Sequence, residues 1–440
     1  MNSVNMWADG RYNMKILFEN ARILTLDEAD HEYINGSLLV ENGKIGYVGP
    51  AKTFDAVDRR IDARGDVLMP GFANAHTHVP MTLLRGVGSD LPLQSWLEDA
   101  VWPLEAKLTA EMIHWGALLG IAEMLRFGVT SFLDMYDHED ILAKDVLDSG
   151  IRAALSRGIM DGNGNGESGM AEARELIENW EGAGEGRIRT MVAPHAIYTC
   201  SGGYLKRARD LADQYKVPIH IHLSETYKEL ADCRKEHGVS PVEYLKDLGL
   251  LDLPVVAAHL VAVDDRDLDI LAEKRVCAVH NPTSNLKLAS GFAPVPDMLK
   301  KGIRVALGTD GAASNNNLSL WEEMNLAALI HKGESLDPTV LPVREVLRMA
   351  TVEGAAAMGY DQVGALKEGN DADMILVDIS GAHYHPIRNV MSHLVYAGQG
   401  LDVRMTMVQG RILMENGEYK TIDFDKVVHE SARAAAQLDS

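Results

Sequence analysis

Side chains that commonly bind metals stand at the ends of several short apolar segments of this 440-residue chain. His76 and His78 end the first of these segments, and His222 and Asp310 end two later ones. Residues two apart on a strand point to the same face, so the first two imidazoles can reach one ion. A parallel barrel gathers such ligands at the carboxyl ends of its strands. We therefore expect a mononuclear metal site and, with it, a hydrolytic enzyme.

Two further proton-transfer groups follow the same segments. Glu225 comes three residues after His222, and His259 ends the next apolar segment. His220 points to the same face one layer deeper, and we interpret it as a hydrogen-bonded core histidine. Imidazole and carboxylate donors suit Zn²⁺, and the same set accepts Fe²⁺ or Mn²⁺. His259 alone could serve packing and Asp310 alone could cap a helix, but their shared position at strand ends favours a site.

Alternating strands and helices must position these residues. Eight apolar segments predict strands, at residues 67–75, 129–135, 152–159, 188–194, 217–223, 255–261, 276–280 and 304–309. Helical patterns lie between them, among others at residues 111–127, 203–216, 264–274 and 343–358. This alternation predicts an α/β fold, a (β/α)₈ TIM-like barrel over residues 70–362. The alternative, an open doubly wound sheet, would carry a glycine-rich phosphate turn after its first strand, and the sequence has none there.

The two ends of the chain are instead rich in short strands. In the N-terminal part, strands are expected at residues 15–18, 22–25, 37–41 and 44–48, with Asn42-Gly43 as a hairpin turn. In the C-terminal part they are expected at residues 372–378, 403–408 and 411–415, and Asn416-Gly417 marks a second turn. Each part alone buries too little surface, so we expect residues 14–69 and 363–440 to form one composite β-sandwich. Residues 426–438 predict an amphipathic helix that packs on its own barrel.

Composition narrows the class of protein. Hydrophobic residues make up 46% and charged residues 24% of the chain, as in an ordinary globular protein. The formal net charge of −22 argues against nucleic acid as a partner. Three widely spaced cysteines argue against a disulfide framework or a thiolate zinc site and favour a reducing cytoplasm. Residues 1–13 lack the apolar core of a signal peptide, and no segment predicts a membrane span.

Five motifs resemble the amidohydrolase superfamily. They are residues 70–78 (PGFANAHTH), 222–226 (HLSET), 280–288 (HNPTSNLKL), 308–314 (GTDGAAS) and 368–373 (EGNDAD). The resemblance extends over nearly the whole chain and is closest to the 5-methylthioadenosine/S-adenosylhomocysteine deaminases. It implies the barrel, the composite β-sandwich and one divalent metal on His76, His78, His222 and Asp310. Binuclear relatives bridge two metals with a lysine after the fourth strand, where this chain has His195.

The resemblance also implies a reaction. It is the hydrolytic removal of the 6-amino group from adenosine-type nucleosides: 5′-methylthioadenosine, S-adenosylhomocysteine, 5′-deoxyadenosine or adenosine. Acid–base logic would have Glu225 carry a proton to ring nitrogen N1, Asp310 accept one from water, and His259 orient that water. The alternative is an aminohydrolase or chlorohydrolase acting on an s-triazine, pterin or other heteroaromatic ring. A metal-free scaffold is a second alternative, which the intact ligand set argues against.

Further residues are expected at the substrate. By resemblance, Glu105 binds ribose hydroxyls, although it could also be a solvated acid at a helix start. His195 contacts the nucleoside, Trp96 lies against its apolar end, and Arg157 grips a substrate carboxylate or shapes the pocket. Residues 161–169 carry no cation where the family often has a second arginine, which favours small 5′-substituted adenosines over S-adenosylhomocysteine. By analogy a homo-oligomer is allowed, although the sequence indicates no interface.

Overall fold

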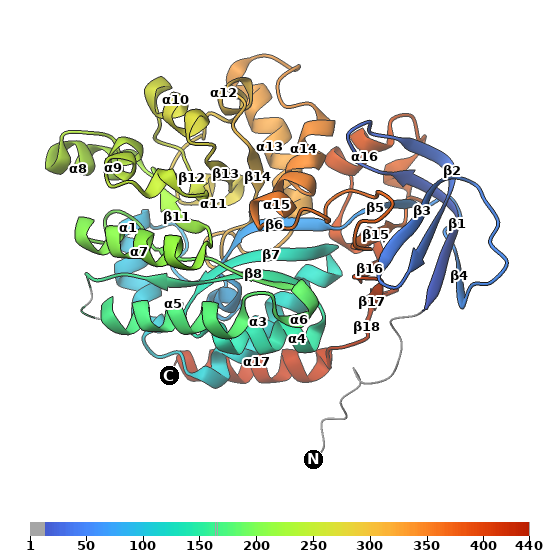
Figure 1. The fold of residues 1–440 in the computed structure, drawn as a ribbon, viewed down its shortest axis with the longest axis horizontal. Helices are drawn as coiled ribbons and strands as arrows, with labels where there is room; N and C mark the ends of the chain where they lie inside the picture. Colours follow the sequence, from blue (N-terminus) through green and yellow to red (C-terminus); the bar gives the residue numbers. More distant parts are fainter. Residues whose placement is uncertain (1–13, 163, 165, 440) are drawn as a thin grey trace.

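The computed structural model describes residues 14–162, 164 and 166–439, which form an α/β structure with parallel strands (Figure 1). The polar segment 1–13 therefore lies outside the described residues. One parallel sheet has the order β10-β8-β7-β6, with β9 paired to β8, and the other has the order β11-β12-β13-β14. The strands are β6 (Phe72–Thr77), β7 (Val129–Tyr136), β8 (Arg152–Ile159), β9 (Ile188–Thr190), β10 (Ala193–Pro194), β11 (Ile219–Leu223), β12 (Val255–His259), β13 (Cys277–His280) and β14 (Val305–Leu307).

Backbone contacts join the two parallel sheets at both edges. Val192 forms a parallel bridge with Ile219 at the start of β11. At the other edge, just after β14, the amide of Asp310 donates to the carbonyl of His76 over 3.0 Å. Gly308 permits this close approach, because a Cβ there would lie only 2.9 Å from the backbone nitrogen of His76. The carboxyl ends of β6 and β14 are therefore neighbours.

Helices follow most of these strands. They include α3 (Ala110–Arg126), α4 (Glu139–Ser149), α5 (Gly166–Trp180), α7 (Gly202–Tyr215), α8 (Tyr227–His237), α9 (Pro241–Asp247), α10 (Asp265–Glu273), α11 (Pro282–Lys287), α12 (Val295–Lys300), α13 (Leu320–Ser335), α14 (Val343–Met349) and α15 (Val352–Ala357). No helix in the described part of the chain is long and apolar enough to cross a membrane. The C-terminal helix α17 (Phe424–Leu438) lies along α3, where Ser431 Oγ donates to the carbonyl of Trp115 over 3.1 Å (Figure 1). It packs on its own chain, as predicted.

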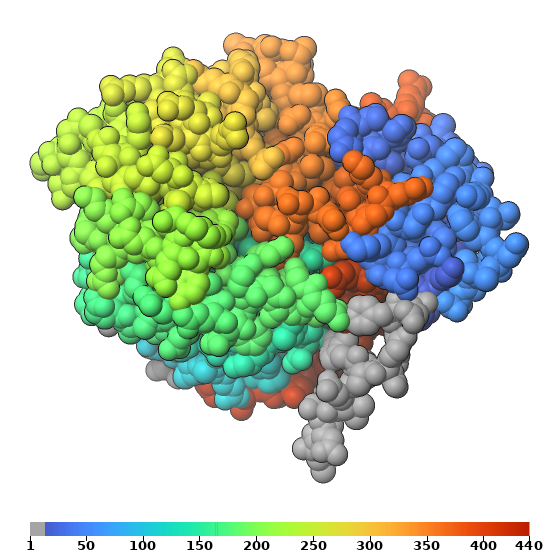
Figure 2. Space-filling view, in the orientation of Figure 1, coloured from blue at the N-terminus to red at the C-terminus, as the bar shows by residue number. Residues whose placement is uncertain are grey.

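The third sheet is mixed and combines both ends of the chain. Its order is β18-β17-β16-β15-β5-β1-β2-β3, and β4 pairs with β1. Figure 2 shows the blue N-terminal part side by side with the orange and red C-terminal part. Both parts contribute to one buried apolar cluster that includes Phe18, Leu38, Leu68, Met374 and Met405. The strands are β1 (Lys15–Leu24), β2 (Glu32–Glu41), β3 (Lys44–Pro50), β4 (Arg59–Asp62), β5 (Val67–Pro70), β15 (Met374–Val377), β16 (Val403–Val408), β17 (Arg411–Glu415) and β18 (Glu418–Tyr419).

Several predicted elements are divided in the structure. Residues 67–75, expected as one strand, break at Gly71 into β5 of the mixed sheet and β6 of a parallel sheet. A Cβ at Gly71 would lie 2.1 Å from Thr130 Cγ2, so only glycine fits where the chain changes sheet. Residues 188–194 likewise divide into β9 and β10.

The helix expected at residues 343–358 is divided as well, into α14 and α15. Thr351, between them, has φ −131° and ψ −85°, outside the helical region. The carbonyl of Ala350 accepts the amide of Ala73 over 2.8 Å, so β6 uses a backbone acceptor at the break. A contact distant in sequence therefore interrupts a pattern that is locally helical.

Candidate metal centre and substrate cavity

The four predicted metal ligands converge at the carboxyl ends of β6, β11 and β14. His78 Nε2 lies 3.0 Å from Asp310 Oδ1 and 3.3 Å from His222 Nε2. His76 Nε2 lies 3.4 Å from the same Asp310 oxygen. Ligand atoms of His76, His222 and His259 also lie within 4.8 Å of one another. Groups far apart in the sequence thus face one small volume.

A hydrogen bond at Nδ1 orients each of the three imidazoles. Nδ1 of His78 and of His222 donate to backbone carbonyls over 2.6 and 2.9 Å. His76 Nδ1 lies 2.9 Å from Nε2 of His220, whose own Nδ1 lies 3.0 Å from Ser156 Oγ. All three Nε2 atoms are left facing the cluster, the arrangement seen in metal-ligating histidines. His220 is buried and hydrogen-bonded, as predicted, and it orients His76.

Two of the three imidazoles are in the neutral form that binds a cation. Burial lowers the pKa of His76 to about 4 and holds the pKa of His222 well below its ordinary value, so both imidazoles are neutral. His76 Nε2 is buried and has no hydrogen-bond partner among the residues that the structure describes. Neutral nitrogen donors beside a carboxylate are a ligand set for a divalent metal.

The carboxylate of this set is held in its charged form. Burial alone would raise the pKa of Asp310, but the neighbouring His76 and His78 hold that pKa well below its usual range. Burial would likewise lower the pKa of His78, and the contact with Asp310 instead raises it to about 9. A metal ion that binds His78 must therefore displace a proton, which makes binding depend on pH.

A cavity of about 650 Å³ opens over this cluster. Much of its wall is apolar and includes Met81, Leu97, Val101, Ile113 and Met160. The predicted site residues along its lining are His78, Trp96, Glu105, His195, His222, Glu225, His259 and Asp310. The structure therefore brings metal-binding, proton-transfer and substrate-binding candidates to one cavity.

The two proton-transfer candidates lie close together in this cavity. Glu225 Oε2 is 4.0 Å from His259 Nε2, and burial raises the pKa of Glu225. His259 Nδ1 lies 2.9 Å from Asn285 Oδ1, and Ser284 Oγ donates to Asp310 Oδ2 over 2.6 Å. The sequence motif 280–288 supported only the family resemblance, and the structure shows that its Ser284 and Asn285 orient two site residues.

The substrate-binding candidates surround the rest of the cavity. Glu105 accepts a hydrogen bond from the hydroxyl of Tyr136 over 2.6 Å, and burial raises the pKa of Glu105. Trp96 is buried, and its Nε1 donates to the carbonyl of Val87 over 3.3 Å. His195 Nδ1 lies 3.0 Å from Thr199 Oγ1. The partner of Glu105 was not anticipated from the sequence.

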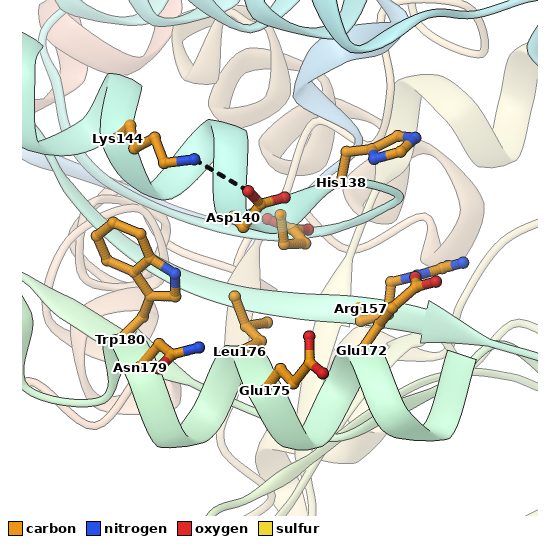
Figure 3. A pocket seen from close by; sticks show the side chains of 10 residues that line it. His138, Asp140, Lys144, Arg157, Glu172, Glu175, Leu176, Asn179 and Trp180 are labelled. Carbon is orange, nitrogen blue, oxygen red and sulfur yellow. Dashed lines mark hydrogen bonds and ion pairs between the residues drawn. The ribbon is translucent and has the colours of Figure 1, made fainter. Parts of the chain in front are cut away.

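Arg157, expected to grip a substrate carboxylate or to shape the pocket, is already paired with two carboxylates. Its Nε donates to Glu172 over 2.6 Å, and its guanidinium also pairs with Asp137. It lines a second cavity, of about 450 Å³, between α4 and α5, where Figure 3 shows it beside Glu172. Successive side chains on a strand alternate between faces. Ser156 bonds His220 in the interior and Gly158 lines the first cavity, so Arg157 leaves β8 on the opposite face, and its partner Asp137 belongs to the first cavity's lining.

Fold and site together define a class of protein. Parallel strands that end in imidazoles and a carboxylate, below a cavity with a buried glutamate, are typical of metal-assisted hydrolases. The chain belongs to the amidohydrolase family, whose family model matches residues 67–413. The resemblance predicted from the motifs is thus confirmed.

Known members of this family resemble the chain over nearly its whole length. It is 46% identical over 425 residues to a 5-methylthioadenosine/S-adenosylhomocysteine deaminase of Dictyoglomus thermophilum, covering 97% of this chain and 99% of that protein. It is 47% identical over 425 residues to a 5′-deoxyadenosine deaminase of Methanosarcina mazei, covering 96% and 98%. Among solved structures, an adenosine deaminase from Xanthomonas campestris with bound zinc matches with a TM-score of 0.93 and 35% identity, covering 97% and 99%.

Proposed function

We propose that this enzyme hydrolyses the 6-amino group of adenosine-type nucleosides and releases ammonia and an inosine-type product. The observation that carries the proposal is the buried Glu225, which shares one cavity with His78, His222 and Asp310. The named activities of the relatives from Dictyoglomus, Methanosarcina and Xanthomonas all concern adenosine or a substituted adenosine. A single substrate class therefore agrees with both the site and the relatives.

The metal in this proposal is one divalent cation held by His76, His78, His222 and Asp310. Zn²⁺ suits these donors, and the zinc bound by the Xanthomonas relative supports that choice over Fe²⁺ or Mn²⁺. When bound, such a cation supplies Lewis acidity that lowers the pKa of water from 15.7 to about 7.

Protein groups carry the protons of the reaction. The raised pKa of Glu225 lets it hold a proton and deliver it to N1 of the adenine ring, which makes C6 electrophilic. Asp310 accepts a proton from the attacking water, and His259 orients that water by a hydrogen bond. The water oxygen then forms a bond to C6, and Asp310 passes the proton that it took from the water to the amino nitrogen. The bond from C6 to that nitrogen breaks, ammonia leaves, and the proton of the C6 hydroxyl returns to Glu225, which leaves a carbonyl at C6 and a proton at N1.

The nucleoside is oriented by the remaining cavity residues. Glu105 accepts hydrogen bonds from the ribose hydroxyls, His195 contacts the nucleoside, and Trp96 lies against the 5′ end. The apolar wall suits an uncharged 5′ substituent. Because Arg157 is already paired with two carboxylates, we propose that 5′-methylthioadenosine, 5′-deoxyadenosine and adenosine are better substrates than S-adenosylhomocysteine.

The architecture belongs to the same proposal. We infer that the two parallel sheets close into a (β/α)₈ TIM-like barrel over residues 70–362, supported by the bridge of Val192 to Ile219 and the bond of Asp310 to His76. Residues 14–69 and 363–440 form the composite β-sandwich, supported by their shared mixed sheet. A cytoplasmic location and a homo-oligomer stay predictions.

Ammonia release over a panel of compounds tests the function. The panel contains the four adenosine-type nucleosides, guanosine, an amino-s-triazine, a chloro-s-triazine and a pterin, and chloride release is followed in parallel. We expect the highest kcat/KM for 5′-methylthioadenosine or 5′-deoxyadenosine. Turnover of a triazine or pterin without nucleoside deamination would establish the alternative activity instead.

A further inference from the structure

Helices α8 and α9 begin with the same sequence pattern, a hydroxyl residue followed three positions later by glutamate. Thr226 Oγ1 accepts the amide of Glu229 over 3.1 Å, and Ser240 Oγ accepts the amide of Glu243 over 3.1 Å. In α9, Glu243 Oε2 also accepts the amide of Ser240 over 3.2 Å, which completes a capping box. The α9 glutamate therefore serves the start of its own helix.

The corresponding glutamate of α8 reaches further back along the chain. Glu229 Oε1 accepts the amide of Ser224 over 3.0 Å, and its Oε2 accepts the amide of Glu225 over 2.8 Å. Both amides precede the N-cap Thr226. Glu229 is buried, and although burial raises its pKa to about 7, the two amide bonds favour its carboxylate form. The two oxygens thus hold the two consecutive peptide groups that lead into Glu225.

The backbone held in this way is unusual. Ser224 has φ +51°, a left-handed conformation that residues with a Cβ rarely adopt. Its carbonyl accepts the amides of Val261 and Ala262 over 2.9 and 2.8 Å. Glu229 therefore fixes one side of the Ser224 turn, and the segment after β12 fixes the other. Glu225 leaves this turn with its side chain in the cavity.

We propose that Glu229 is a positioning residue that holds the Glu225 carboxyl group where it exchanges a proton with the substrate ring. Glu229 is not among the residues that line the cavity, so it acts through Glu225. This inference rests on the proposed role of Glu225. A misplacement of about 1 Å can cost roughly 10²-fold in rate, so a clamp on the backbone is enough to matter.

The test compares Glu229→Gln with the matched control Glu243→Gln, on whichever substrate of the panel the wild-type protein turns over best. A glutamine at 229 keeps the size of the side chain but can accept only one of the two amides through its single oxygen. We expect kcat to fall roughly 10- to 100-fold in Glu229→Gln, with KM and metal content within about twofold of wild type. In Glu243→Gln, kcat is expected to stay unchanged.

A double-mutant cycle separates positioning from a general structural role. When Glu225 is already glutamine, Glu229→Gln should change the residual kcat less than about twofold, because the group that it positions is gone. An undiminished loss in that background, or wild-type kcat in a folded Glu229→Gln, overturns the proposal. If Glu229→Gln does not fold, Glu229→Asp replaces it, with the same expected fall in kcat and the same contradicting results. Failure of the proposed nucleoside activity shows instead in the panel, before any variant is made.

Discussion

Two hairpins of the mixed sheet and the candidate metal centre use the same left-handed backbone conformation with different residues. In the sheet, the hairpin residues Asn42 and Asn416 have φ +52° and +51°, and each is followed by glycine. Asparagine and glycine adopt this conformation at low cost, which is why Asn-Gly pairs predict hairpins. At the metal centre, Ser224, His259 and Asp310 have φ +51°, +78° and +61°.

At these two hairpins the left-handed residue is one that favours the turn, whereas at the metal centre the left-handed residues carry or adjoin a functional group. A left-handed residue with a larger side chain costs about 1–3 kcal/mol and persists only where the surroundings hold it. At the centre, backbone bonds such as that from the Asp310 amide to the His76 carbonyl do so. The hairpin turns add to the stability of the fold. At the metal centre, strained residues lower that stability slightly and orient the imidazole and carboxylate groups. Each prediction below therefore assigns a change to activity or to stability.

The largest effect on activity is expected from Glu225→Gln. An amide of the same size cannot transfer the proton to the substrate ring, so kcat should fall about 10²- to 10⁴-fold. Metal content and the unfolding midpoint should stay near the wild-type values, because Glu225 is not a proposed ligand. Steady-state ammonia release and metal analysis check both statements, and unchanged turnover would remove Glu225 from the mechanism.

The largest effect on stability is expected from Arg152→Ala. This arginine, on β8, is 2% exposed and donates to Asp373 over 2.8 Å and to Asp371 over 3.0 Å, next to β15 of the mixed sheet. Its removal leaves the buried Asp373 without its cation, so the free energy of unfolding should fall by about 3–5 kcal/mol. Urea denaturation measures this. A folded variant should keep the wild-type kcat, and a loss of kcat without a loss of stability would contradict the division between the two regions.

A smaller effect, on substrate affinity alone, is expected from Glu105→Gln. Charged hydrogen bonds to ribose hydroxyls contribute about 1.5–3 kcal/mol, so KM should rise roughly 10- to 150-fold while kcat changes little. The control substrate is 2′,3′-dideoxyadenosine, which lacks these hydroxyls. Its KM should be the same with the wild-type protein and with Glu105→Gln. Equal losses on both nucleosides would mean that Glu105 does not bind ribose.

The smallest effects come from the left-handed residues themselves. Asn416→Ala should lower the free energy of unfolding by about 1 kcal/mol and leave kcat unchanged, because alanine is less tolerant of positive φ.

Ser224→Gly should have the opposite effects, because glycine relieves the strain of this turn. The free energy of unfolding should stay the same or rise by up to about 1 kcal/mol, and kcat should fall because the turn before Glu225 is looser. Thermal and urea unfolding are compared with kcat for each variant. The reverse assignment, in which the sheet variant loses kcat, would contradict the comparison.

Periodicity and strand ends carry most of the information that the sequence holds about the site. His76, His78, His222 and Asp310 could be grouped because the carboxyl ends of neighbouring parallel strands lie together. The alternation of side chains along a strand also bears on Arg157. Ser156 and Gly158 face inward, so the arginine between them leaves the strand on the other face. Its side chain lies between α4 and α5, paired with Glu172.

Other features had no local signal. Arg152 and Asp373 are 221 positions apart, and nothing in the spacing of either indicates the pair. Gly71 did have one, because Pro70-Gly71 is a pair that commonly interrupts a strand. That the chain changes sheet there depends on tertiary contacts such as the close approach of Gly71 to Thr130. Glu229 did have a signal, because a hydroxyl residue three positions before a glutamate indicates a helix start. Its reach to Ser224 depends on the tertiary turn, which the pattern does not encode.

The central claim is that the clustered histidines and Asp310 bind a divalent metal that the reaction needs. It is tested most directly by measuring metal content and activity together during exhaustive chelation and reconstitution. We expect one divalent ion per chain, and the ligand set favours zinc. Ammonia release should fall in proportion to the metal removed and return when one equivalent is restored. His78→Ala should carry far less metal under the same conditions. A protein that binds no divalent ion, or that works equally well after complete chelation, would contradict the account.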